Sequence, residues 1–425
     1  MIWLSLGLVA LALLGAPLFT VIAASALLGF AASGIDLSVV MVEFHRLGEM
    51  PVLVAIPLFT FAGYLLGETG APQRIVRITQ ALLGWLPGGL AIVTIASCAL
   101  FTAFTGASGV TIVALGALLY PALQLAGYGE RFNLGLVTSS GSLGVLFAPS
   151  LPLILYGVVA QQLQLGRPVS IEDLFVAGFL PGLLMLVMLG GWSSWRNRAL
   201  RTSMAAFSWR EAAAAVRESA WEIPLPFVVL GGIYGGYFAV SEAAAVTVAY
   251  VLVVEVLILR EVPIAKLPDI MRRSMVLVGA VLAILGMALA STNYLVDAEV
   301  PAKLFTAVRE HISSPQTFLL ALNLFLLVLG MLLDIFSATV IMVPLLLPIA
   351  IGYGIDPLHL GIVFLANMQI GYFTPPVGMN LFIASYRFDK PVLELCYATL
   401  PFFFILLAAV LIITYWPALS LALVR

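Results

Sequence analysis

Apolar segments follow one another along the whole chain, and this pattern indicates the class of protein. Each run of roughly 20 apolar residues is long enough to cross a hydrocarbon core of about 30 Å. We count on the order of ten to fourteen such segments, some of them too short or too interrupted to span cleanly. Because lipid cannot satisfy backbone hydrogen-bonding groups, the crossing segments are expected to be α-helices. The pattern predicts an all-α integral membrane protein, a single polytopic domain over residues 1–425.

One apolar segment, NMQIGYFTPPVGMNLF, is interrupted in its middle by Pro375 and Pro376. An ordinary membrane-spanning helix does not carry two adjacent prolines, because each removes a backbone donor and its ring clashes with the preceding turn. A second apolar segment, GSLGVLFAPSLPLILY, contains Pro149 in a comparable place. We therefore expect two crossing helices that break at membrane depth, with Pro149, Pro375 and Pro376 at the breaks.

The two broken segments belong to a longer pattern that occurs twice. A proline, a glycine and a second proline follow one another at the same spacing in both halves of the chain: Pro121, Gly144 and Pro149, then Pro348, Gly371 and Pro376. A polar interruption precedes each set, FTAFTGASGVT in the first half and LLDIFSAT in the second. Matches in the same order indicate an internal duplication of roughly 200 residues. We place the repeat halves at residues 1–221 and 222–425.

Paired, interrupted hydrophobic segments at matching positions are typical of the binding site of a secondary transporter. Backbone groups that a helix break leaves free survive at membrane depth only where they face protein, water or a ligand. Free carbonyls can coordinate a small cation, and the N-terminal ends of half-helices attract an anion. The sequence therefore predicts an ion and substrate transport core over residues 101–160 and 330–390.

Composition and charge refine this picture. Hydrophobic residues make up 62% of the chain and charged residues 9%, whereas soluble domains carry about 25% charged residues. Much of the positive charge lies in two groups, which the positive-inside rule places in the cytoplasm: Arg196, Arg198, Arg201, Arg210 and Arg217, then Arg260, Lys266, Arg272 and Arg273. The apolar segment between them, 223–259, contains GGIYGG and is too long for one straight crossing. It forms either two half-crossings that return to the same side or one strongly tilted helix.

Five motifs in order give the chain a family resemblance: IPLFTFAGYLLGETG, FTGASGVT, GSLGVLFAPSLPLILYG, GGIYGGYFAVSEAAAV and GYFTPPVGMNLF. Together they resemble the large membrane subunit of tripartite ATP-independent periplasmic (TRAP) transporters, over nearly the whole chain. The resemblance implies a sodium-driven importer of organic acids, with inverted repeats, that works by an elevator motion. The imported acid would be a C4-dicarboxylate, a sialic acid or a similar carboxylate or sulfonate.

The resemblance also implies particular structural elements and partners. Re-entrant helical hairpins would form around 101–121 and 332–348, and the crossing helices would break near 139–149 and 371–380. The expected partners are a small membrane subunit, a periplasmic substrate-binding protein, the organic acid and membrane lipid, with no nucleic acid. The expected location is the cytoplasmic (inner) membrane of a bacterium or archaeon.

Sodium is a hard cation, so its ligands should be hydroxyl, carboxylate and backbone carbonyl oxygens. The candidates are the polar and glycine residues at the interruptions of the two halves: Ser108, Gly109, Ser139, Ser140 and Gly141, then Asp334, Ser337, Gly371 and Thr374. The alternative is that these small residues only allow helices to pack closely, as they do in membranes. Both interpretations remain open for each residue taken singly.

Asp334 is the only Asp, Glu, Lys or Arg between Glu310 and Asp356. A carboxylate at membrane depth is costly and is by default a functional hypothesis. A bound sodium ion or a proton would offset this cost, whereas the simpler alternative is a helix N-cap, which Asp favours. Glu242, beside the GGIYGG break, has the same two interpretations.

The candidates for substrate binding are Thr105, Gln369 and Asn380, which lie near the interruptions and carry hydrogen-bonding side chains. No Lys or Arg occurs between residues 78 and 129 or between 357 and 386. An anionic substrate would therefore be held in the core by half-helix N-termini, amides and bound sodium, or by an arginine from elsewhere in the chain.

Other function classes are less consistent with the sequence. No GxxxxGK[ST] motif is present, so uphill transport would draw on an ion gradient and no cofactor is expected. An intramembrane enzyme would need paired aspartates or a histidine–glutamate metal group on facing helices. The three histidines and two cysteines share no metal-type spacing, so no metal other than sodium is expected. We therefore expect that the protein is not an enzyme. The alternative function is a stand-alone, ion-coupled carrier of organic anions that needs no binding protein.

Overall fold

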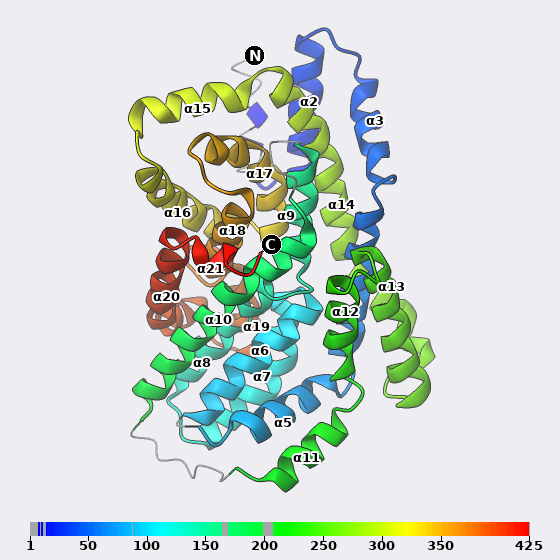
Figure 1. Cartoon of the computed structure of the whole chain (residues 1–425), viewed down its shortest axis with the longest axis vertical. Helices are drawn as coiled ribbons and strands as arrows, with labels where there is room; N and C mark the ends of the chain where they lie inside the picture. Colours follow the sequence, from blue (N-terminus) through cyan, green and yellow to red (C-terminus); the bar gives the residue numbers. More distant parts are fainter. Residues whose placement is uncertain are drawn as a thin grey trace.

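The computed structural model describes residues 7–8, 10–11, 14–86, 88–163, 169–198 and 207–424, and these ranges contain helices and connecting turns but no strand (Figure 1). The helices of the first half are α2 (Leu18–Ala32), α3 (Ser38–Leu47), η1 (Pro51–Val54), α4 (Ala55–Gly67), α5 (Ala71–Leu83), α6 (Gly89–Thr105), α7 (Ser108–Leu125), α8 (Glu130–Ser140), η2 (Leu143–Leu146), α9 (Leu151–Gln162), α10 (Ile171–Arg196) and α11 (Trp209–Glu218). Those of the second half are α12 (Pro224–Tyr234), α13 (Val240–Val251), η3 (Leu252–Ile258), η4 (Ile264–Lys266), α14 (Leu267–Asp297), α15 (Val300–His311), α16 (Pro315–Leu332), α17 (Ile335–Gly352), α18 (Pro357–Gly371), α19 (Met379–Phe388), α20 (Val392–Tyr415) and α21 (Ala418–Leu421).

The length and composition of these helices confirm the predicted membrane fold. Within the described ranges, seven helical segments are long and apolar enough to cross a membrane, and two bent helix pairs raise the number to as many as nine. One bent pair is α8–η2 with α9, which bends by 42°; the other is α3 with η1–α4, which bends by 64°. Shorter apolar helices, α6, α12 and α18 among them, account for further apolar segments of the sequence.

Two helical hairpins form at the polar interruptions. In the first, α6 and α7 meet at Gly106 and Ala107; Gly106 has a φ of 65°, a left-handed conformation that glycine adopts at little cost. In the second, α16 and α17 meet at Leu333 and Asp334. The family resemblance implied hairpins around 101–121 and 332–348, and both turns lie within these ranges.

The two broken helices pack against each other in the centre of the molecule. Ser142, in the break after α8, donates its hydroxyl to the carbonyl of Gln369 on α18 at 3.1 Å. Tyr156 on α9 donates to the carbonyl of Pro357, at the start of α18, at 2.7 Å. Nearly every residue of α9 and α18 is buried. Contacts between the two halves of the chain therefore build the core.

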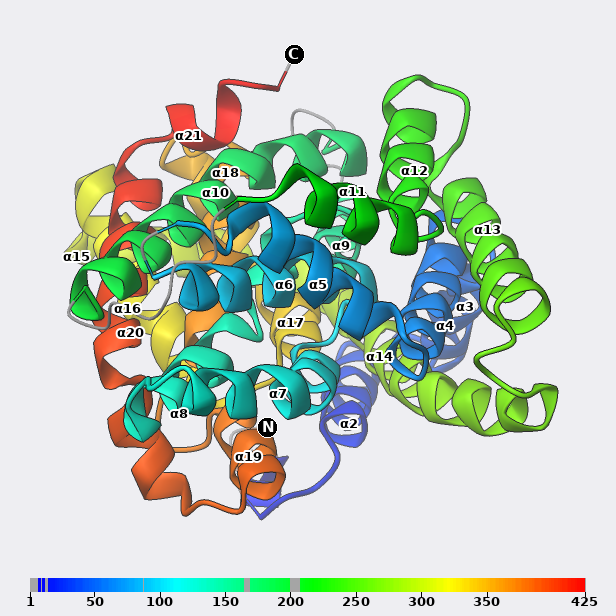
Figure 2. The same ribbon diagram turned by 90° about the horizontal axis from the view of Figure 1, so that it is seen from below.

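A second group of helices stands to one side of this core (Figure 2). Within it α14 packs on α2, α3 and α4, and α13 packs on α4. The α12 and α13 helices are two arms that turn back at residues 235–239, and Tyr250 on the second arm donates to the carbonyl of Trp221 before the first at 2.7 Å. Of the two alternatives for this apolar segment, the two-armed one is confirmed. Glu242 accepts a hydrogen bond from the N–H of Ala239 at 2.9 Å, so it caps α13.

Helices α5 and α11 lie at one end of the molecule, at the bottom of Figure 1, and are joined by an ion pair between Arg77 and Glu211 at 3.0 Å. Because α11 carries part of the first basic group and α5 contacts the chain just before α14, where the second group lies, both groups share this end. Arg201 of the first group lies outside the described residues. By the positive-inside rule, we expect this end to face the cytoplasm.

A buried charge cluster holds α5 in place. The Arg74 guanidinium contacts Glu222 at 2.5 Å, Glu261 at 2.5 Å and Glu255 at 3.5 Å. Glu255 lies in the π-helical turn η3 and is only 1% exposed. Burial raises the pKa of the Glu222 carboxyl above its ordinary value. One guanidinium thus pairs with three carboxylates from two chain segments. The attachment of α5 to these segments therefore depends on Arg74.

We expect Arg74→Met to lower the free energy of unfolding by about 3–5 kcal/mol, because it leaves the buried carboxylate of Glu255 and the largely buried carboxylate of Glu222 without their cation. Thermal unfolding of the purified protein in detergent measures this change. Arg77→Met is the matched control. Arg77 is 44% exposed and pairs with exposed carboxylates of α11, so its replacement should cost no more than about 1 kcal/mol. Equal effects of the two substitutions would contradict the assignment.

Candidate functional site

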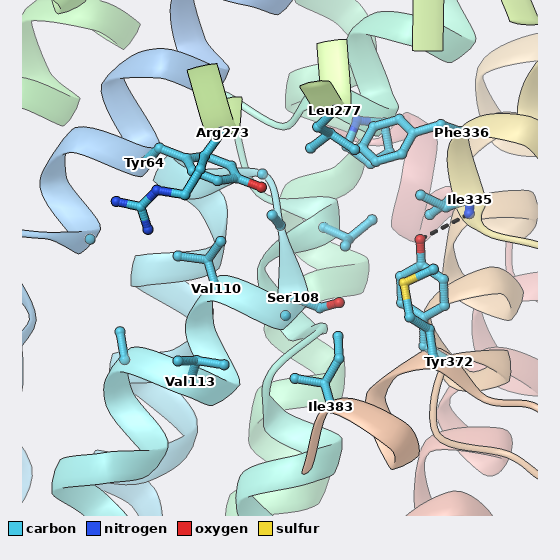
Figure 3. A pocket seen from close by; sticks show the side chains of 18 of the residues that line it. Tyr64, Ser108, Val110, Val113, Arg273, Leu277, Ile335, Phe336, Tyr372 and Ile383 are labelled. Atoms are coloured by element: carbon cyan, nitrogen blue, oxygen red, sulfur yellow. Dashed lines mark hydrogen bonds between the residues drawn. The ribbon is translucent and has the colours of Figure 1, made fainter. Parts of the chain in front are cut away.

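A cavity of about 510 Å³ lies where the tips of both hairpins meet the second broken helix (Figure 3). The first hairpin contributes the residues from Gly106 to Val110, and the second contributes Ile335 and Phe336 at the start of α17. Tyr372 and Met379 come from the two sides of the break between α18 and α19. The opposite wall comes from outside this core, from α4 and α14, with these lining residues: Tyr64, Gly67, Glu68, Arg273 and Leu277.

A hydrogen bond crosses from one half of the chain to the other beside this cavity. The hydroxyl of Ser108, at the start of α7, donates to the side-chain oxygen of Asn380 at 2.8 Å. The amide nitrogen of Asn380 in turn lies 3.5 Å from the carbonyl of Thr138 on α8. The structure thus brings together a residue predicted to bind sodium and one predicted to bind substrate, and Thr138 was missed by the sequence analysis.

Several hydroxyl oxygens near the first break have no hydrogen-bond partner in the described part of the chain. They are those of Thr105, Thr138 and Ser140, and all three side chains are fully buried. Ser139, by contrast, donates to the carbonyl of Gly135 within its own helix at 2.7 Å. Buried polar groups are normally satisfied, so unpaired oxygens are places where a bound cation would supply the missing interaction. A similar role for Gly141 would use its backbone carbonyl, which accepts from the Thr102 hydroxyl at 2.8 Å.

Asp334 caps α17 at the tip of the second hairpin. One carboxylate oxygen accepts from the N–H groups of Phe336 and Ser337, each at 3.0 Å, and the other accepts from the Ser337 hydroxyl at 2.5 Å. The N–H of Ile335 donates to the hydroxyl of Tyr372 at 2.9 Å, the bond drawn in Figure 3. The capping interpretation is confirmed, and it leaves the carboxylate charge free for a second role.

The remaining predicted residues lie as follows. Pro149 stands between η2 and α9, and Pro375 and Pro376 stand between α18 and α19; the peptide bonds before Pro149 and Pro376 are cis. Gly109 lines the cavity, whereas Gln369 points its amide nitrogen at the sulfur of Met185 on α10 at 2.7 Å. Thr374 donates its hydroxyl to the carbonyl of Ile370 at 2.7 Å.

Sequence reasoning missed Tyr64, Arg273 and Tyr372 as lining residues. Tyr372 lies inside the GYFTPPVG motif, so its position beside the break could have singled it out. Arg273 was assigned only to a cytoplasmic basic group, because nothing in one sequence indicates that α14 approaches the first hairpin.

A second cavity, of about 630 Å³, lies between α6, α10 and α12. Its described lining residues are apolar except for the hydroxyl of Tyr234, and none of them is charged. Such a lining offers nothing to an organic acid or an ion, so the cavity at the hairpin tips is the candidate site.

The second break depends on a close approach of two glycines. A methyl group placed on Gly371 would lie 2.5 Å from the Cα of Gly330 on α16, too close for any side chain. We expect Gly371→Ala to destabilise the protein by about 1–3 kcal/mol through overpacking, and to lower any transport that the break supports. Thermal unfolding in detergent measures the effect. Gly129→Ala is the control, because no atom of the described residues lies within 4 Å of its added methyl group; a similar loss in both variants would show that the close approach is unimportant.

Comparisons with known proteins add to this geometry. Residues 5–419 match the family model described as "Tripartite ATP-independent periplasmic transporter, DctM component". The isethionate TRAP transporter permease protein DctMQ of Oleidesulfovibrio alaskensis is 35% identical over 90% of this chain, which spans 59% of that relative. The C4-dicarboxylate TRAP transporter large permease protein DctM of Pseudomonas aeruginosa is 34% identical, over 90% of this chain and 88% of that protein. The ectoine/5-hydroxyectoine TRAP transporter large permease protein UehC of Ruegeria pomeroyi is 32% identical, over 98% of this chain and 96% of that protein.

Among solved structures, the YdaH transporter of Alcanivorax borkumensis is similar to this chain, with a TM-score of 0.62 and coverage of 91% of this chain and 89% of that one. The two sequences are 15% identical. This likeness supports the fold alone.

Proposed function

The chain belongs to the family of the DctM component of tripartite ATP-independent periplasmic transporters, and on this premise we propose that it imports an organic acid together with sodium ions. It is a large permease subunit, a multi-span protein of the inner membrane and not an enzyme. The observation that carries the proposal is the meeting of two hairpin tips and a helix break around one cavity. The proposed partners are a small membrane subunit and a periplasmic substrate-binding protein.

The substrate is proposed to be a small organic acid. The relatives above are named for isethionate, C4-dicarboxylates and ectoine, all small polar molecules with an acidic group. We assign the substrate to the 510 Å³ cavity at the hairpin tips. The N-terminus of α7 is open there, since no side chain of the described residues caps it, whereas the first N–H groups of α17 are taken by Asp334 and Tyr372. The acidic group therefore fits the first hairpin better than the second.

Sodium ions are proposed to bind at the two breaks. In the first half the donors are Ser108, Gly109, Ser139, Ser140 and Gly141, and in the second Asp334, Ser337, Gly371 and Thr374. Support for the first site comes from the unpaired hydroxyl of Ser140. Support for the second comes from the charge of Asp334, which no cationic side chain of the described residues neutralises. Asn380 and Thr105 stand beside the first site and are proposed to link it to the substrate; Gln369 is proposed to act only through the packing of α18 on α10.

The proposed movement is that of an elevator. The transport core, residues 101–160 and 330–390, would carry substrate and ions past the helices that include α4 and α14. One sodium ion entering across 100 mV supplies about 2.3 kcal/mol, and a tenfold concentration ratio adds about 1.4 kcal/mol. Two ions would supply about 7 kcal/mol from both sources, so a gradient alone could drive import of a monoanion.

The test is uptake of labelled organic acids by proteoliposomes that hold this chain and its small subunit, with and without the binding protein, under a sodium or a proton gradient. We expect uptake that needs both sodium and the binding protein. Uptake that continues without the binding protein would favour the alternative, a stand-alone carrier. Uptake that follows protons alone would remove the proposed sodium sites.

Asp334→Asn should raise the sodium concentration for half-maximal uptake at least about tenfold, a loss of about 1.4 kcal/mol, because Asn still caps α17 but carries no charge. Thr374→Ala should also raise the sodium concentration for half-maximal uptake. Asp356→Asn is the control: Asp356 caps α18 in the same way, accepting from Leu358 at 2.8 Å and His359 at 3.4 Å, and it does not line the cavity. If Asp334→Asn and Asp356→Asn behave alike, the Asp334 charge has no part in coupling.

A further inference from the structure

Arg273 is the only Lys or Arg among the described residues that line the cavity, and it comes from α14, outside the core. Its guanidinium contacts Glu68 at 2.9 Å and Asp269 at 2.9 Å. In Figure 3, Arg273 and Tyr64 lie together on one wall, with Ser108 below them and Tyr372 on the far side. A guanidinium presents paired N–H donors that match a carboxylate or a sulfonate.

This wall belongs to the cytoplasmic end of the molecule. Glu68 directly follows α4, and two residues later the N–H of Gly70 donates to Glu261 at 2.6 Å, within the charge cluster of Arg74. Arg273 itself belongs to the second basic group, at the end that α5 and α11 occupy. The ion pair of Arg273 and Glu68 therefore lies where the cavity opens toward the cytoplasmic side.

The ion pairs of Arg273 are easy to exchange. The side chains of Arg273 and Glu68 are 44% and 37% exposed, so water screens their attraction. Such exposed pairs contribute about 0–1 kcal/mol. An incoming carboxylate or sulfonate can replace Glu68 as the partner of the guanidinium at little cost, whereas the lining residues that the structure describes in the core offer no cationic side chain that would compete.

From these observations we infer that Arg273 is the cytoplasmic exit contact for the acidic group of the substrate. The inference rests on the proposed function. Because α14 lies across the cavity from the hairpin tips, the contact exists only while the core faces this side. Arg273 thus sets the affinity for substrate on the cytoplasmic face and leaves the affinity on the periplasmic face to the core and the binding protein.

The experiment measures the two faces separately. Proteoliposomes with this chain and its small subunit are loaded with increasing concentrations of the transported acid, and binding protein with labelled acid is added outside. Because the binding protein docks only on the periplasmic face, it selects one orientation of the permease. The measured quantities are the external KM and the internal concentration that halves net uptake.

For Arg273→Gln we expect the internal half-inhibitory concentration to rise about tenfold, while the external KM stays within about twofold. The internal half-inhibitory concentration of Arg273→Lys should lie between those of the wild type and Arg273→Gln, because lysine keeps the charge and loses the paired donors. Arg272→Gln is the matched control, since Arg272 pairs with Asp269 at 3.0 Å but does not line the cavity; it should behave as the wild type.

The outcomes separate this inference from the proposed function. If the wild type takes up the acid but Arg273→Gln leaves the internal half-inhibitory concentration unchanged, the exit contact is wrong and the proposed function stands. The same conclusion follows if Arg273→Gln changes only the external KM. Absence of any uptake of organic acids by the wild type would overturn the proposed function and this inference with it.

Discussion

The structure depends on one constraint: a backbone polar group at membrane depth must find a partner inside the protein. An unsatisfied group in hydrocarbon costs several kcal/mol, and this chain breaks its helices repeatedly where such groups are freed. At the break after α18, the N–H of Asn380 donates to the carbonyl of Tyr372 at 2.8 Å, and the N–H of Gly378 donates to the carbonyl of Met331 on α16 at 3.2 Å. The hairpin tip beside it is repaired by Asp334 and the Tyr372 hydroxyl. The breaks of the core therefore lie where such partners are available.

The same constraint explains why the two halves of the chain are interlocked. The break of each half packs against helices of the other half. The contact of Ser142 with Gln369 and that of Ser108 with Asn380 join the halves at this level. A site built here belongs to neither half. Polar side chains in the core thus serve two purposes, since the groups that complete the backbone also surround the cavity.

Outside the core, charged side chains also hold helices together. Helix α5 connects α4, on the outer side, to the first hairpin of the core, and the Arg74 cluster ties it to the segments around α12 and α13. Arg77 adds exposed pairs to α11. The buried cluster holds one end of the connection, while the cavity side of α4 and α14 carries the exposed, exchangeable pair of Arg273 and Glu68. Burial distinguishes a charge that holds the structure from one that is available to a ligand.

The sequence by itself determined the class of protein and the broken segments, because each depends on local chemistry, whereas the helical hairpins were implied by the family resemblance. Apolar runs of about 20 residues must span as helices, adjacent prolines cannot continue one, and an acidic residue before Ile335 caps the helix that follows it. The matching spacing around Pro149 and Pro376 also predicts that the two breaks correspond. Only the tertiary structure decided which side chains meet. The pairing of Ser108 with Asn380, the placement of Gln369 against Met185, and the approach of Arg273 to the first hairpin join residues far apart in the chain. Such contacts follow from how helices pack side by side, and the periodicity of a single helix carries no information about its neighbour.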